Sequence, residues 1–297
     1  MAIPALQALD QALSGAVASV APSVVHVARG RGGGSGVAWS SDLVISSSFH
    51  TPDRTQIGIG TTDFDVEFRD AEVIGRDPGS DVALLRVAGG GLTPAPFREL
   101  EQLGVGSLAL AIGRPGRTAR ASLRAIGVLG PDVRTPWGKL ERYVESDRQI
   151  PRGFAGGPLV DAAGQVIGMN TRTLIRGADL AIPAVTLRRV VAELEAHGGV
   201  RRGYLGVGVY PVALAAAVAT TAGRQRGALV ASIEDGGPAA AAGILVGDIL
   251  IAIDGAAIEG PDGLRTALDD RPGDDVQLEL IRGGVVQRLS ATLGSRP

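Results

Sequence analysis

The chain has no cysteine among its 297 residues, which excludes disulfide bonds, thiolate catalysis and cysteine-based metal sites. Aromatic residues make up only 3% of the sequence, so the cores must be built from Val, Ile, Leu and Ala. Lys139 is the single lysine, the formal net charge is −2, and there is no long basic run. This charge distribution argues against nucleic acid as a partner.

Long apolar runs are also missing, and none reaches the length of a membrane span. The N-terminus has no basic region followed by an apolar stretch, so we expect no signal peptide in this sequence. The remaining composition is ordinary for a globular protein, 45% hydrophobic and 20% charged, in a chain long enough for two domains. We expect no cofactor and no metal site.

Short β-type runs dominate the pattern along the chain. Apolar residues at helical spacing predict an amphipathic helix over 5–20, ended by Pro22, and a second helix after Pro183 that stops at Gly198. Between these helices, short strands alternate with turn signals, which favours β-barrels or a sandwich. The glycine triplet 32–34 is predicted to be a loop. The strands expected in the first half are Val24–Ala28, Gly36–Trp39, Leu43–Ser46, Gln56–Gly60, Ala71–Ile74 and Val82–Val87.

Residues 151–159, Pro-Arg-Gly-Phe-Ala-Gly-Gly-Pro-Leu, carry the strongest chemical signal. They are similar to Gly-x-Ser-Gly-Gly-Pro-Leu, the nucleophile loop of trypsin-like serine proteases. Gly153, Phe154 and Ala155 are the candidates for an oxyanion hole, because a glycine-rich loop can present backbone N–H groups to a substrate carbonyl. The position of the nucleophilic serine is Ala155, however, and a methyl group cannot attack a carbonyl. The sequence therefore predicts a protease framework that does not cleave.

Only three histidines are available as a general base. His26 lies within a strand pattern and His197 ends a predicted helix, where a cation complements the helix dipole, so both are interpreted as structural. His50 follows a strand, as the base of a trypsin-like fold does, and the alternative is a surface-loop histidine. Asp81 opens a buried strand and could orient the imidazole, and the alternative is a turn residue after Pro-Gly. The order His50, Asp81, Ala155 is that of chymotrypsin.

Four further segments, 77–85, 111–116, 164–171 and 180–183, resemble motifs of the HtrA family of serine proteases. Besides Ala155, one departure stands out: the family has Thr-Asn-x-His before its base, whereas residues 45–50 are Ile-Ser-Ser-Ser-Phe-His. The segments similar to family motifs are 77–85 (Asp-Pro-x-Thr-Asp-Leu-Ala-Val-Leu in the family), 111–116 (Ala-Ile-Gly-Asn-Pro-x-Gly), 164–171 (Gly-x-Val-Ile-Gly-Ile-Asn-Thr) and 180–183 (Phe-Ala-Ile-Pro).

The resemblance covers roughly residues 20–297 and implies a mainly β fold. It implies a chymotrypsin-like double β-barrel followed by a small PDZ domain, a β-sandwich with two helices. The expected parts are an N-terminal helical segment (1–22), a trypsin-like protease domain (23–199) and a PDZ domain (200–297). Residues 129–139 resemble a loop that couples PDZ occupancy to the active site. The primary specificity pocket is expected near Asn170, Thr171 and Arg172, where the absence of an acidic residue favours an apolar P1 residue.

The C-terminal part resembles a PDZ domain through two segments. Residues 203–207 are similar to the carboxylate-binding loop, and 247–255 match the Gly-Asp-x-Ile-x-x-Ile-Asp-Gly strand. The implied mode is β-augmentation, in which a peptide with an apolar C-terminus adds as a strand beside a helix over 262–268. The alternative is a β-domain used only for oligomer contacts. The residues assigned to peptide binding are Tyr204, Leu205, Gly206, Val207, Leu264 and Leu268.

Together these resemblances imply a serine endopeptidase that degrades unfolded or misfolded proteins, here without its nucleophile. The simplest account of Ala155 is a serine-to-alanine substitution that traps substrate or prevents autolysis. The alternatives are a natural pseudoprotease with a peptide-binding or chaperone-like role, and a scaffold that acts only through its PDZ domain. The resemblance further implies a periplasmic or membrane-anchored location and homotrimers built through N-terminal segments, although residues 1–28 contain no Phe, Tyr or Trp.

Overall fold

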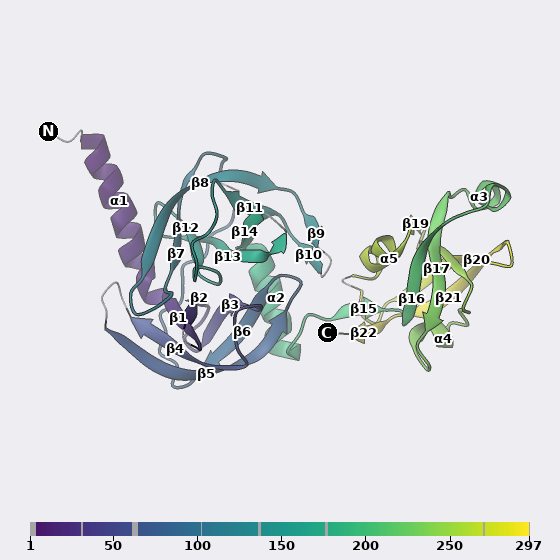
Figure 1. Cartoon of the computed structure of the whole chain (residues 1–297), viewed down its shortest axis with the longest axis horizontal. Helices are drawn as coiled ribbons and strands as arrows, with labels where there is room; N and C mark the ends of the chain where they lie inside the picture. Colours follow the sequence, from purple (N-terminus) through teal and green to yellow (C-terminus); the bar gives the residue numbers. More distant parts are fainter. Residues whose placement is uncertain are drawn as a thin grey trace. The chain divides into compact units, whose positions relative to one another are not determined.

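The structure is a computed structural model. It describes residues 4–30, 32–60, 65–101, 103–135, 138–175, 178–269 and 271–296. The side chains of residues 133–139 are not described. The chain forms two compact units, Met1–Val200 and Arg201–Pro297. Strands dominate both units (Figure 1), which confirms the predicted mainly β fold.

A closed barrel of six antiparallel strands occupies the first half of the first unit, in the order β1-β2-β3-β6-β5-β4, with β1 paired to β4. Aliphatic side chains such as Val25, Ile57 and Leu85 fill it, as the scarcity of aromatic residues requires. Every strand predicted from the sequence overlaps one of these strands, and β6 matches its prediction at both ends. The strands are β1 (Val24–Arg29), β2 (Gly32–Ala38), β3 (Leu43–Ser47), β4 (Arg54–Gly60), β5 (Val66–Asp77) and β6 (Val82–Val87).

A second closed barrel follows, in the order β11-β14-β13-β12-β7-β8, with β8 paired to β11. The two barrels confirm the chymotrypsin-like architecture. The segment 129–139 forms the end of β8 and most of a β9–β10 hairpin, and its residues 136 and 137 lie outside the described part of the chain. The strands are β7 (Leu108–Gly113), β8 (Arg120–Gly130), β9 (Val133–Thr135), β10 (Gly138–Leu140), β11 (Tyr143–Ser146), β12 (Pro158–Asp161), β13 (Val166–Ile175) and β14 (Ala178–Pro183).

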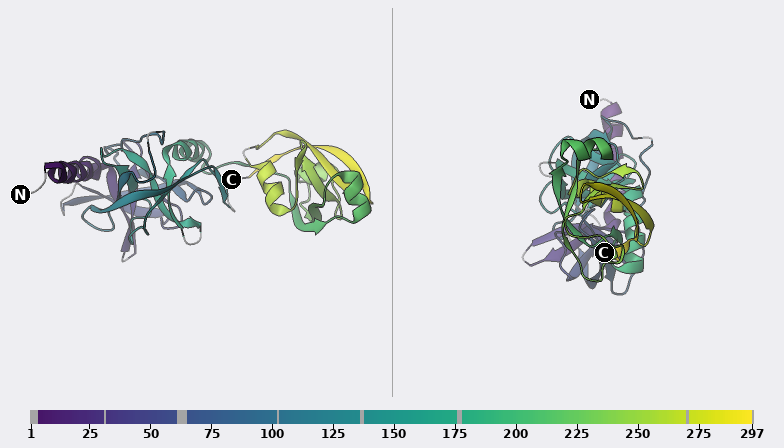
Figure 2. Two further views of the ribbon diagram at one scale, coloured as in Figure 1. Left: turned by 90° about the horizontal axis from the view of Figure 1, so that it is seen from above. Right: turned by 90° about the vertical axis from the view of Figure 1, so that its right-hand side faces the viewer.

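The N-terminal helix α1 (Pro4–Val20) is held to the second barrel by its last turns. Gly164, with φ 78°, lies so close that an added Cβ would come within 2.4 Å of the Ser19 hydroxyl oxygen. The other end projects away from the barrels (Figures 1 and 2), and Leu6 and Leu9 there are 58% and 38% exposed. The helix predicted over 5–20 is thus confirmed, and only part of its apolar stripe is covered within the chain.

Two other helical segments complete the first unit. The 3₁₀ helix η1 (Ala21–Ser23) contains Pro22, so the chain leaves the α-helical path where the proline predicted it. Helix α2 (Ala184–His197) begins after Pro183 and ends at Gly198, whose φ of 73° gives a left-handed cap. Both helix ends were predicted from the sequence.

Arg114, at the end of β7, ties the entrance of the first barrel to the second barrel. Its side chain is completely buried, and its Nε donates to the carbonyl oxygen of Val24 at 2.7 Å. Its Nη2 donates to the carbonyl oxygens of Ala21 at 3.2 Å and Gly60 at 2.9 Å. Burial lowers the pKa of this guanidinium from its usual value. The backbone of three separate elements therefore converges on one cation.

The glycine triplet 32–34 is a strand, and the prediction of a loop there was wrong. It forms the first part of β2 and pairs with β1, for example Gly33 with Ala28. The reason is a close approach: a Cβ at Gly33 would lie only 1.9 Å from the ring of His26. The glycine is needed for packing against that ring, not for a turn.

The second unit is built on a sheet in the order β16-β17-β18-β20-β21, with β19 paired to β18, and a separate ribbon of β15 and β22. Its strands are β15 (Arg202–Tyr204), β16 (Val207–Ala213), β17 (Arg226–Ile233), β18 (Ile249–Ile253), β19 (Ala256–Ala257), β20 (Asp275–Arg282), β21 (Val285–Thr292) and β22 (Gly294–Arg296). Its described helices are α3 (Ala216–Ala222), α4 (Pro238–Ala241) and α5 (Pro261–Leu268). None of the helices in the described residues of either unit is long and apolar enough to cross a membrane.

Candidate active site and peptide groove

A cleft of about 300 Å³ is lined by residues of both barrels. His50 lies on the turn after β3, whereas Gly153 and Ala155 lie on the loop before β12. The structure therefore brings the predicted base and the nucleophile position to one hollow. The lining residues are Arg29, Gly32, Gly33, Gly34, His50, Arg152, Gly153, Ala155 and Arg172.

The loop around Ala155 is glycine-rich because neighbouring backbone approaches it closely. A Cβ at Gly156 would lie 2.2 Å from the carbonyl oxygen of Ser35, and one at Gly157 would lie 2.3 Å from that of Ile112. Ser35 also donates its hydroxyl hydrogen to the carbonyl oxygen of Gly153 at 2.6 Å. The first barrel thus fixes the path of the loop in the second barrel.

The three backbone N–H groups predicted for the oxyanion hole divide into two kinds. Within the described part of the chain, the N–H groups of Gly153 and Ala155 have no acceptor. The N–H of Phe154 donates to the carbonyl oxygen of Pro151 at 3.2 Å, and its ring is buried in the core of the second barrel. Two donors therefore remain available for a carbonyl or an anion, and Phe154 anchors the loop.

Asp81 is held in place by donors on three sides. It is fully buried in the turn between β5 and β6, with a φ of 56°. Its carboxylate accepts hydrogen bonds from the Thr171 hydroxyl at 2.5 Å and from the backbone N–H of Phe49 at 3.1 Å. The Ser47 hydroxyl lies 2.8 and 2.9 Å from its two oxygens. These hydrogen bonds satisfy the buried carboxyl group and fix its orientation.

Ser47 stands between His50 and Asp81. Its hydroxyl oxygen lies 2.9 Å from His50 Nδ1. When the Ser47 hydroxyl donates its hydrogen to the Asp81 carboxylate, its oxygen can accept a hydrogen bond from His50 Nδ1–H, and in a neutral imidazole that tautomer leaves Nε2 as the acceptor. Ser47 therefore links the predicted base to the predicted acid through one hydroxyl, and the catalytic roles of His50 and Asp81 stay predictions. The sequence analysis missed Ser47, and the only signal was the departure from Thr-Asn-x-His.

The predicted specificity residues have different surroundings. Asn170 is buried, and its side-chain amide donates to the carbonyl oxygen of Pro158 at 2.9 Å. Thr171 is buried against Asp81. Of the three, only Arg172 lines the cleft, with its Nε 3.6 Å from a carboxylate oxygen of Asp179. The geometry gives Asn170 and Thr171 positioning roles, and contact with a substrate stays a prediction for Arg172.

The other two histidines lie away from the lining of the cleft. The ring of His26 is buried, with Nδ1 3.0 Å from the carbonyl oxygen of Arg114 and an edge-on contact with Phe68. His197 lies in the last turn of α2, on the surface. Both positions agree with the structural roles inferred from the sequence.

A second concave site lies in the other unit, between the edge strand β16 and helix α5. All six residues assigned to PDZ peptide binding line it: Tyr204, Leu205, Gly206, Val207, Leu264 and Leu268. In the described part of the chain, the N–H groups of Leu205 and Gly206 have no acceptor. Because β16 is paired on one side only, its other edge is open to an added strand.

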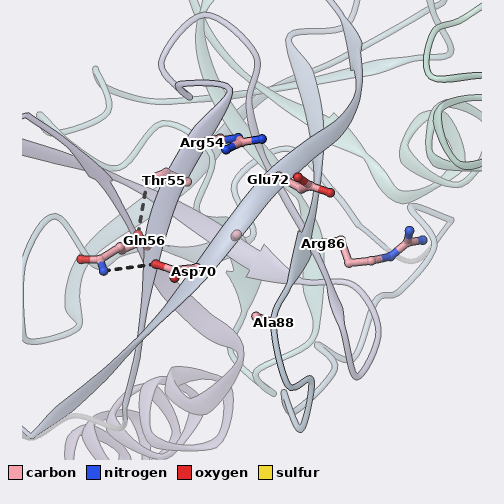
Figure 3. Close-up of a pocket in the computed structure, with 8 residues that line it drawn as sticks. Arg54, Thr55, Gln56, Asp70, Glu72, Arg86 and Ala88 are labelled. Atoms are coloured by element: carbon pink, nitrogen blue, oxygen red, sulfur yellow. Dashed lines mark hydrogen bonds between the residues drawn. The ribbon is translucent and has the colours of Figure 1, made fainter.

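A larger hollow of about 690 Å³ lies on β4, β5 and β6 of the first barrel (Figure 3). Its side chains carry both signs of charge, Arg54 and Arg86 on the one hand and Asp70 and Glu72 on the other. It shares no lining residue with the cleft at His50, and it holds no nucleophile beside a base. Among the described residues, no three acidic or histidine side chains are grouped as a metal site.

Comparison with known proteins gives the family. A trypsin-like peptidase domain matches residues 34–169, and a PDZ domain matches residues 203–293. Two proteins named as probable periplasmic serine endoproteases, DegP-like, from Ectopseudomonas mendocina and Pseudomonas putida, are 32% and 33% identical over 272 residues. The chain belongs to the HtrA family of trypsin-like serine proteases.

Solved HtrA structures agree over nearly the whole chain. A structure of the HtrA-type protease AlgW with a decapeptide superposes with a TM-score of 0.73 at 26% identity, covering 96% of this chain and 99% of that one. The serine endoprotease from Yersinia pestis gives 0.72 at 25% identity, covering 97% and 98%. The matches to the two curated HtrA relatives cover 89% of this chain and 56% of each relative, so the chain spans about half of their length.

Proposed function

We propose that the first unit is the machinery of an endopeptidase for unfolded or misfolded proteins, in a form that binds substrate without cleaving it. The observation that carries the proposal is Ala155, which occupies the nucleophile position while the rest of the site is retained. His50 Nδ1 lies within hydrogen-bonding distance of Ser47, Ser47 bonds to Asp81, and the N–H groups of Gly153 and Ala155, which have no acceptor among the described residues, are available to bind a carbonyl. These features support binding, and the missing hydroxyl prevents acyl transfer.

A second candidate function is that of a natural pseudoprotease with a peptide-binding, chaperone-like or scaffold role. It is favoured by the region before the base, where Ser47 separates His50 from Asp81. A chain under selection for hydrolysis has reason to keep the direct contact between imidazole and carboxylate, because that contact orients the base.

The proposal predicts that the full chain binds unfolded casein without hydrolysing it. Photo-crosslinkers placed beside the cleft, at Thr173, and beside the PDZ groove, at Pro261, should both capture labelled casein, and mass spectrometry should find no new peptide ends. A folded protein of similar size serves as the control and should not be captured. Cleavage by this chain would overturn the proposal. Capture at Pro261 alone would support a scaffold that acts only through its PDZ domain.

For the second unit we propose capture of free peptide C-termini with an apolar last residue. The free N–H groups of Leu205 and Gly206 and the apolar walls at Leu264 and Leu268 support it. Hydrogen bonds to a charged group contribute about 1.5–3 kcal/mol, so amidating the terminus should weaken binding by about ten- to a hundred-fold.

Titration calorimetry on an acid and amide pair of one peptide measures this effect. Leu264→Asn should weaken both forms, because it removes an apolar wall and leaves the carboxylate loop in place. Equal affinity of the acid and the amide for the parent chain would refute the carboxylate loop.

An extracytoplasmic location and a homotrimeric assembly are also part of the proposal. The location is supported by the curated relatives, which are named as periplasmic. The trimer rests on the family resemblance, together with the exposed Leu6 and Leu9 on the projecting end of α1.

A further inference from the structure

The walls of the protease cleft carry positive charge and no negative charge. Of the nine side chains and glycines that line it, three are arginines, one is His50, and none is Asp or Glu. This is a local property, because the whole chain has a formal net charge of −2. An anionic ligand is therefore favoured at this place and not by the protein in general.

Two of the three arginines have no partner in the part of the chain that the structure describes. Among the described residues, no ion pair or hydrogen bond reaches the side chains of Arg29 or Arg152, and both are exposed. Arg172 has a looser contact with Asp179 at 3.6 Å. Asp81 lies behind Ser47, where its carboxylate is already bonded to three donors. The cations of the cleft are thus left for a ligand.

The neutral groups of the cleft also suit an anion or a carbonyl. The N–H groups of Gly153 and Ala155 have no acceptor in the described chain, and both residues follow Arg152 in the same loop. Among the described residues that line the cleft there is no Phe, Tyr or Trp, so the broad stacking platforms typical of single-strand nucleic acid sites are missing from this lining. The lining favours an extended polypeptide with carboxylate side chains over a single-stranded nucleic acid.

We propose that the protease cleft selects acidic segments of unfolded polypeptides, with Asp or Glu side chains paired to Arg29, Arg152 and Arg172. The inference rests on the proposed function, since it names the class of substrate that the cleft takes. Each exposed pair should contribute about two- to five-fold in affinity, the range of solvent-exposed ion pairs. Three pairs together should favour an acidic peptide over its neutral amide analogue by at least about ten-fold at low salt.

The test measures binding of fluorescent peptides to the full chain by anisotropy. Short peptides with acetylated N-termini and amidated C-termini exclude capture by the PDZ carboxylate loop. One peptide carries Asp and Glu, and its partner carries Asn and Gln at the same positions. We expect the acidic peptide to bind at least about ten-fold more tightly, and the advantage to shrink towards 1 M salt, where the Debye length falls to about 3 Å.

Variants locate the effect. Arg152→Gln and Arg29→Gln should each weaken the acidic peptide about two- to five-fold and leave the neutral peptide unchanged. Arg54→Gln, in the separate hollow of Figure 3, is the matched control and should change neither. An equal loss in Arg54→Gln would assign the preference to diffuse charge and overturn the inference.

The remaining outcomes separate this inference from the proposed function. Equal binding of the acidic and neutral peptides would overturn the acidic preference and leave peptide binding intact. Absence of binding by any peptide would refute the proposed function of the cleft, and the inference with it. A labelled single-stranded oligonucleotide with the same net charge as the acidic peptide is measured in the same way. If the oligonucleotide binds more tightly than the acidic peptide, the inference that the ligand is a polypeptide is refuted.

Discussion

Replacing Ala155 by serine should turn the chain into a protease for unfolded casein. A comparable triad loses on the order of 10⁶ in kcat with its nucleophile, about 8 kcal/mol of barrier. Loss of the correctly oriented carboxylate lowers kcat by about 10⁴ in such a triad. Here Asp81 reaches His50 only through the hydroxyl of Ser47, so part of this loss is expected. The gain over the parent chain should therefore lie between about 10² and 10⁶.

Two double variants separate the roles of the base and the relay. Ala155→Ser with His50→Ala should return to the parent rate, because no other base faces position 155. Ala155→Ser with Ser47→Ala should lower kcat and leave KM unchanged, since Ser47 orients the imidazole and does not line the cleft. A folded Ala155→Ser chain that stays at the rate of the His50→Ala control would support the natural pseudoprotease instead.

Replacing Arg114 by methionine should lower the free energy of unfolding of the first unit by about 3–5 kcal/mol, as for a buried charged group whose partners are left behind. The carbonyl oxygens of Ala21, Val24 and Gly60 would each lose a hydrogen bond from the guanidinium, and Ala21 and Val24 are fully buried. Removing the buried charge recovers part of its desolvation cost. We expect the loss of these hydrogen bonds to dominate, because several of them depend on one side chain.

Arg124 provides the matched comparison for this experiment. It is also buried, but in the described structure its Nε and Nη1 have no hydrogen-bond partner. Arg124→Met should therefore leave stability unchanged or raise it by about 1 kcal/mol, because it removes a desolvated cation and orphans no acceptor at those atoms. Urea unfolding followed by tryptophan fluorescence reports on the first unit alone, since both tryptophans, at 39 and 137, lie in it. Equal effects of the two substitutions would contradict the role given to the Arg114 carbonyl contacts.

The parts of the fold that follow local rules could be predicted from the sequence. Pro22, Pro183 and Gly198 act on the backbone through their own dihedrals, so the helix ends next to them were correct. The buried strand β6 was predicted at both ends. Gly33 could not be assigned to a strand from the sequence. A glycine is required there because the ring of His26 lies against it across the β1–β2 pair, and this contact is visible only in the folded structure.

The candidate site could also be predicted only in part, namely where a local motif marks a residue. His50, Asp81 and Ala155 were named from their order and motifs; the structure places His50 and Ala155 at one cleft and links His50 to Asp81 through Ser47, and their catalytic roles stay predictions. The relay through Ser47 was not predicted, because the run Ser46-Ser47-Ser48 gives no sign of which hydroxyl lies between two side chains. Nor could burial of Arg114 be inferred, since an arginine is ordinarily exposed and only the packed barrels show which carbonyls surround it.

The hydrogen bond from Ser35 to the carbonyl of Gly153 has a thermodynamic consequence for ligands. Ser35 belongs to the first barrel, and its hydroxyl oxygen also accepts the backbone N–H of Arg114 at 2.7 Å. The orientation of the peptide unit after Gly153 is therefore set when the barrels pack, and its ordering entropy is lost during folding. A peptide that binds at Gly153 and Ala155 meets donors that are already immobile, so little further ordering of this loop opposes its binding.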